Sequence, residues 1–217
     1  MKGMADGAAV ASRFGLDHHV VEELLLDYEA QGWVTRVRFA GIGGWALTAA
    51  GRAENERRLA AELEETTARP EIEAAHGEFL TLNSRFLAAV TNWQIRPERA
   101  DPLAANDHTD WRWDERVLDD LRRLERQVRP VGQQLAAAMD RFSGYPERYS
   151  AALDKVDRGQ RAWVDQPRID SCHTVWMELH EDLLATLGLE RRRKSFLRCH
   201  RVPGTRSPPR NTVCGEL

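Results

Sequence analysis

Residues 170–182 place a dense group of polar and aromatic side chains in one short stretch, Asp-Ser-Cys-His-Thr-Val-Trp-Met-Glu-Leu-His-Glu-Asp. On a helix, His173, Trp176 and His180 share one face because they are three, four and seven residues apart. Neutral imidazoles converging with carboxylates bind transition metals, and His76 or Asp107 would be the partner in such a site. A histidine facing a helical bundle more often only forms hydrogen bonds there, so we assign no metal ligand.

The adjacent residues Ser171, Cys172 and His173 could suggest nucleophilic catalysis. Neighbouring residues on a helix do not face each other, so no Cys–His couple follows from this order. We find no other motif that requires an enzyme, and we predict no catalytic residue and no cofactor.

A second group of candidate residues lies in a long interruption of the helical pattern, from Asn92 to Trp113. Loops of this length are usually functional or disordered, and three tryptophans argue against disorder. The rings could close one end of a helical bundle, or the loop could cover a small, partly apolar ligand. In the second interpretation the pocket is bounded by Trp93, His108, Trp111 and Trp113 from the loop, together with the face that carries His173, Trp176 and His180.

The N-terminal elements that could position DNA contacts follow one another closely. A short helix from Gly7 breaks at Gly15, and Asp17 is placed to cap a second helix that begins at His18 and stops at Gly32. Residues 33–39 alternate as a strand, glycines at 41, 43 and 44 make a turn, and residues 45–48 return as a second strand. This order is typical of a winged helix, which lays its second helix in a DNA major groove.

The sequence "SRFGLD…LLLDYEAQGWVTR…GWALTAAGR" resembles the winged-helix domain of MarR-like bacterial regulators. Its most specific part is Leu47-Thr48-x-x-Gly51-Arg52, in which the threonine caps the helix that leaves the wing. Over residues 1–190 the pattern also resembles actinobacterial winged-helix regulators. The resemblance implies a further helix ahead of these elements, which we expect to be lost or to lie upstream of Met1. It implies DNA contacts at Arg13, His18, His19, Arg36, Arg38 and Arg52.

The charge of this region opposes simple DNA binding. Residues 1–70 contain eight Lys and Arg against eleven Asp and Glu. The second helix carries Glu22, Glu23 and Asp27 at positions that would face bases or phosphates, which repel carboxylates. The alternative is therefore a winged helix that serves as an interaction module.

Residues 71–190 show apolar stripes at helical spacing and no strand signal, which predicts an antiparallel bundle of about five helices with a kink or break at Pro130. The fold class is thus mainly α, with a winged helix-turn-helix over residues 1–66, a sensing or dimerising bundle over 71–190 and a basic tail over 191–217 that we expect to be disordered. Residues His76 to Asn92 are also similar to the first helix of the effector domain of GntR-type regulators. That family's metal-binding Asp and His are replaced here by Asn83 and Leu87.

Composition excludes several classes of protein. No apolar run is long enough to span a membrane, and the N-terminus has no secretory signal pattern, which predicts a cytoplasmic protein. Three widely spaced cysteines suit reduced thiols rather than a disulfide framework.

Two functions remain open. The first is a homodimeric regulator that binds double-stranded DNA and responds to an unknown small-molecule effector. The second is a winged-helix module that no longer reads DNA and binds a protein or a small molecule beside a metabolic enzyme.

Overall fold

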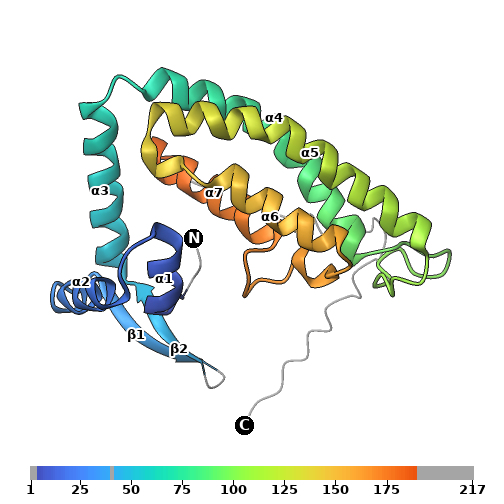
Figure 1. Cartoon of the computed structure of the whole chain (residues 1–217), viewed down its shortest axis with the longest axis horizontal. Helices are drawn as coiled ribbons and strands as arrows, with labels where there is room; N and C mark the ends of the chain where they lie inside the picture. Colours follow the sequence, from blue (N-terminus) through green and yellow to red (C-terminus); the bar gives the residue numbers. More distant parts are fainter. Residues whose placement is uncertain (1–3, 40–41, 190–217) are drawn as a thin grey trace, which may run out of the picture.

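The computed structural model describes residues 4–39 and 42–189 and is mainly helical (Figure 1). The basic tail predicted over 191–217 lies outside the described residues. Helix α1 (Gly7–Phe14) begins at Asp6, whose carboxylate accepts the Ala9 N–H, and ends at Gly15 in the left-handed region. Helix α2 (His18–Ala30) is capped as predicted, because the Asp17 carboxylate accepts the N–H groups of His19 and Val20.

An antiparallel hairpin follows, made of β1 (Val34–Phe39) and β2 (Ile42–Leu47), with Val34 opposite Leu47. Ala5 pairs with Trp45 on the other edge of β2, through N–H···O bonds of 3.0 and 2.7 Å. The segment before α1 thus adds a third short strand position to the hairpin. The small core beneath it consists of Ala11, Val21, Leu25, Val34 and Trp45.

Thr48 joins this unit to helix α3 (Ala49–Glu65). Its hydroxyl accepts the Gly51 N–H at 2.9 Å and donates to the Gly32 carbonyl at 2.6 Å. A side chain at Gly51 would meet the Trp33 carbonyl oxygen at 1.9 Å. The Thr48 cap predicted from the sequence is confirmed, and the glycine three residues later is needed for close approach of two backbones.

Within the described residues, the segment from 69 to 187 forms a bundle of four helices, with two single 3₁₀ turns in the connections. They are α4 (Arg69–Gln94), α5 (Trp111–Ala138), η1 (Asp140–Phe142), α6 (Tyr145–Asp157), η2 (Arg161–Trp163) and α7 (Cys172–Leu187). The predicted helical bundle is confirmed, but it has four helices rather than about five, because α5 continues through Pro130 without a break. Its buried residues keep one spacing on both sides of Pro130: Val117, Leu121, Leu124, Val128, Val131 and Leu135. Burial of this unbroken stripe outweighs the missing backbone hydrogen bond.

Helix α7 packs against α3, α4 and α6, so the bundle and the hairpin unit meet through α3 (Figure 1). A polar cluster crosses this junction. Arg141 pairs with Glu62 of α3 and with Asp182 of α7, and the Tyr145 hydroxyl donates to Asp182 at 3.0 Å. Burial and the nearby carboxylate raise the pKa of Tyr145 above its ordinary value, which keeps this donor protonated. No helix among the described residues is long and apolar enough to cross a membrane.

We predict that Gly51→Ala lowers the free energy of unfolding by about 2 to 3 kcal/mol, because the new methyl group overlaps the Trp33 backbone. Urea unfolding followed by circular dichroism measures the change. Ala50→Gly, at the exposed neighbouring position, is the matched control and should cost about 1 kcal/mol or less. Equal losses in the two variants would contradict the close backbone contact.

Candidate functional site

The cations predicted to contact DNA divide into two groups. Arg36 and Arg38 are exposed on one face of β1, two residues apart, and Arg52 is exposed in the first turn of α3. The Arg36 guanidinium lies over the Trp45 ring at 4.7 Å and 3.5 Å from the Glu29 carboxylate. Glu29 therefore partly neutralises the charge of Arg36. Arg38 and Arg52 form no ion pair with another residue of the segments 4–39 and 42–189, so they are the freer cations of this group there.

Arg13 of α1 contacts the helical bundle. It is half-buried, and its guanidinium lies 4.7 Å from the centre of the Tyr145 ring in α6. This position joins α1 to the bundle. Arg13 is therefore placed to hold the two parts of the chain together rather than to meet a phosphate beside Arg36 and Arg38.

His18 and His19 occupy the first two positions of α2, where both are exposed and their rings lie 6.1 Å apart. The acidic character of α2 is reduced in part by folding. A side chain at Gly7 would lie 1.8 Å from the Glu22 carboxylate, so Glu22 fills the space beside α1 instead of facing outward. Glu23 and Asp27 stay exposed.

The residues predicted to bind a ligand also fall into two clusters. In the loop cluster, Trp93 is buried and its ring lies 4.4 Å from that of His108. The Trp113 indole donates to the Asn92 carbonyl at 2.7 Å, whereas the Trp111 ring is two-thirds exposed. Trp93 lies in the last turn of α4 rather than in the loop, and Trp113, in the first turn of α5, contacts the same end of α4, as in the interpretation in which the rings close one end of the bundle.

A buried carboxylate that the sequence reasoning missed organises the loop cluster. Asp114 is 3% exposed, accepts the Asn106 side-chain N–H at 2.9 Å, and lies 3.1 Å from the His108 Nδ1 and 3.3 Å from Arg161. His108 adopts φ 57°, a left-handed backbone that costs a residue with a side chain about 1 kcal/mol or more. The available signal was an aspartate in the first turn of a helix, six residues after the histidine.

The second cluster lies along the contact between α4 and α7. The Trp176 ring stacks on Phe86 at 4.2 Å, and its indole donates to Asn83 at 2.9 Å. The His173 ring is parallel to that of Phe86 at 6.3 Å, and the His180 ring lies 6.5 Å from that of His76. These side chains form a continuous aromatic layer between the two helices.

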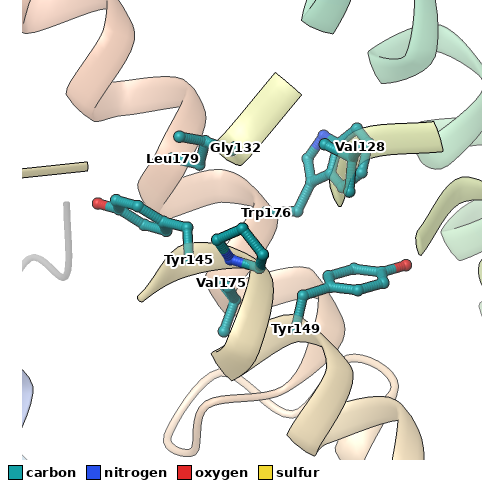
Figure 2. Close-up of a pocket in the computed structure, with 8 residues that line it drawn as sticks. Val128, Gly132, Tyr145, Tyr149, Val175, Trp176 and Leu179 are labelled. Carbon is teal, nitrogen blue, oxygen red and sulfur yellow. The ribbon is translucent and has the colours of Figure 1, made fainter. Parts of the chain in front are cut away.

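Neither the cavity of Figure 2 nor the groove beside it is lined by residues of both clusters. The clusters approach each other at the start of α7, because His173 stacks on Phe86, which is seven residues and about 10 Å along the axis of α4 from Trp93. His76, beside His180, is about 25 Å from Trp93 along the same axis. The cavity in Figure 2 lies instead between α5, α6 and α7, where Tyr145, Tyr149 and Trp176 leave a volume of about 10 Å³. That volume holds about one water molecule. Of the seven predicted ligand residues, Trp176 alone lines this cavity within the described chain.

A larger, open groove of about 340 Å³ lies beside it, between the end of α5 and the start of α6. It is lined by Gly132, Gln133, Ala136, Ser143, Gly144, Pro146 and Glu147. None of the tryptophans of the loop cluster contributes to this lining.

Two kinds of site considered from the sequence are a metal site and a reactive thiol. Within residues 4–39 and 42–189, no three His, Cys, Asp or Glu side chains are grouped so that they could hold a metal ion. Asp107 instead pairs with Arg96 at 2.9 Å and accepts from Thr109. Burial raises the pKa of the Cys172 thiol to about 12, so it stays protonated at neutral pH and is a poor nucleophile.

Comparison with protein families, with curated proteins and with solved structures finds no match to this chain. Function is therefore inferred from the residues and their geometry.

We predict that Asp114→Ala lowers the free energy of unfolding by about 3 kcal/mol, because it removes one of the two acceptors of the buried Asn106 amide, the other being the Trp93 carbonyl, and leaves His108 without its carboxylate. Urea unfolding followed by tryptophan fluorescence measures this change. Asp120→Ala removes an exposed pair with Arg123 on the same helix and should change stability by about 0.5 kcal/mol or less. Similar values for both variants would show that Asp114 does not anchor the loop.

A second prediction concerns pH. Burial lowers the pKa of His76 below its ordinary value of 6.5, so the unfolded chain binds this proton more readily than the folded chain does. Stability should therefore fall as the pH drops through about 6.5 toward the lower folded pKa. His76→Leu should remove part of this decline between about pH 7 and pH 5, while His19→Gln, at an exposed site, should keep it. An unchanged pH dependence in His76→Leu would refute the assignment.

Proposed function

We propose that residues 4–65 form a winged helix that binds duplex DNA, and that the helical bundle controls this binding. The observation that carries the proposal is the order of paired elements: the strand position at Ala5, α1, α2, the hairpin, and α3 capped by Thr48. This arrangement places α2 on the outside of the unit, with the hairpin beside it.

The distribution of charge suits contacts to the DNA backbone more than base reading by α2. Arg38 and Arg52 are exposed, and Arg36 keeps most of its side chain in solvent. Because Glu22 folds back over Gly7, two carboxylates rather than three remain on the exposed part of α2. We therefore expect weak binding that depends strongly on salt, with most of its free energy from phosphate contacts of the wing.

The bundle is suited to transmit a signal to this unit. The open groove between α5 and α6 has the volume of a small-molecule site and includes Pro146, the residue after Tyr145. Tyr145 contacts Arg13 of α1 and Asp182 of α7. An effector in this groove would act on the contact that fixes the orientation of α1.

A specific observation favours the second function, a module that binds another protein. Val20 and Leu24 lie on the outer face of α2 and are 48% and 39% exposed, and Phe14 at the end of α1 is 62% exposed. Apolar side chains interspersed with Glu23 and Asp27 fit a protein surface better than a phosphate backbone.

DNA binding across a salt series distinguishes the two functions. If DNA is bound, the double variant Arg36→Ala/Arg38→Ala should weaken binding to all sequences alike and lower the slope of log affinity against log salt by about 2. The double variant Arg123→Ala/Arg126→Ala, at exposed positions of α5, is the control and should leave both quantities unchanged. No binding by the unmodified chain at about 50 mM salt, or an unchanged slope in the wing variant, would favour the interaction module.

A further inference from the structure

Helix α4 presents an uncharged face to solvent over the four turns from Gly77 to Thr91, and the exposed Glu73, one turn earlier on the same side, pairs with Arg69 at 3.6 Å. The residues on this face are exposed and lie within about 120° of one another around the helix axis: Gly77, Leu80, Thr81, Ser84, Leu87, Ala88 and Thr91. We call these seven residues the α4 face. Helix α5 differs, because its exposed positions include Arg112, Glu115, Arg116, Arg123, Arg126 and Arg129.

Two of the three hydroxyls on the α4 face already have acceptors within the helix. Its two leucines, one heptad apart, are 43% and 42% exposed. Its two threonines donate their hydroxyl hydrogens to their own helix, Thr81 to the Glu78 carbonyl at 2.7 Å and Thr91 to the Leu87 carbonyl at 2.8 Å. Burying these hydroxyls against an apolar partner would therefore leave no donor unsatisfied.

Two opposite charges border the α4 face on one side. Glu78 and Arg85 are one heptad apart and both exposed. Within the described residues neither forms an ion pair, and the Arg85 guanidinium donates only to the neutral Gln127 amide, at 2.7 Å. The pair is thus available to a partner that carries the opposite charges in the opposite order.

We infer that the α4 face binds the same face of a second copy of this chain, with the two helices antiparallel about a two-fold axis between Thr81 and Leu82. This axis brings Glu78 of each copy opposite Arg85 of the other, on the same side of the interface, so both ion pairs form. Because Glu78 and Arg85 on one copy are complementary to Arg85 and Glu78 on another, we assign the partner of this face as a second copy of the chain.

The same axis interleaves the leucines on the other side of the interface. It places the second copy's Leu80 opposite position 83 and the second copy's Leu87 opposite position 76. Four leucines then follow one another at intervals of four, three and four residues, as in helix pairs that pack side chains into each other's gaps. Gly77 and Ala88, near the middle of the face, allow the backbones to approach closely.

A charge exchange tests the inference without reference to DNA. In sedimentation experiments on the full chain, Glu78→Arg and Arg85→Glu should each raise the dimer dissociation constant about tenfold or more. The double variant Glu78→Arg/Arg85→Glu restores both pairs and should return to within about threefold of the unmodified chain. A monomeric unmodified chain, or a double variant no tighter than the single ones, would overturn the proposal.

Crosslinking tests the position of the axis. In a Cys199→Ser/Cys214→Ser background, Thr81→Cys lies beside the axis and should give a disulfide-linked dimer under mild oxidation. Thr91→Cys is on the same face, but the two copies of residue 91 would be about 28 Å apart, so it should stay uncrosslinked. A crosslink at 91 and not at 81 would assign the dimer to another surface. Leu80→Glu/Leu87→Glu should abolish the dimer, whereas the control Leu103→Glu, at an exposed position outside α4, should keep it. Dimers that persist equally in both variants would also assign the interface elsewhere.

Discussion

The burial of Trp176 is the constraint on which the rest of the structure depends. Its ring is 1% exposed and lies against Phe79 and Phe86 of α4, with Tyr149 of α6 on a further side. The indole N–H is satisfied by Asn83, so this large ring is buried without loss of a hydrogen bond. One side chain thereby fixes α7 against two neighbouring helices.

Because α7 is fixed, the polar groups on its other face are fixed as well. The Asp182 carboxylate accepts a hydrogen bond from the Tyr145 hydroxyl and forms an ion pair with Arg141. Arg141 forms a second ion pair with Glu62 of α3. The Tyr145 ring also makes a cation–π contact with the Arg13 guanidinium of α1. The orientation of the hairpin unit on the bundle therefore depends on charged and aromatic contacts, which respond to a local displacement more readily than an apolar core does.

Local signals predicted the parts of the fold that are set by nearby residues. Asp17, Gly15 and Thr48 cap or end their helices as expected, because capping depends on a few adjacent backbone groups. The continuity of α5 through Pro130 was not predicted, since burial against α4 and α6 decides it. The same holds for Arg13 and Asp114, whose roles follow from partners far along the chain or across a loop, and spacing alone does not reveal such partners.

The antiparallel dimer would set the distance between the points at which the two α3 helices join the bundles. The hairpin unit joins the 17-residue helix α3 at Ala49, and the far end of α3 leads into α4, which begins at Arg69. With the two-fold axis between residues 81 and 82, the two copies of Arg69 would be about 38 Å apart, because 25 residues of helix separate their levels at 1.5 Å each. The two α2 helices lie one further helix away from these points, because α3 stands between each hairpin unit and Arg69. Their separation in such a dimer is therefore set by the direction in which α3 leaves α4, which the contacts of Glu62 with Arg141 and of Arg13 with Tyr145 hold in place.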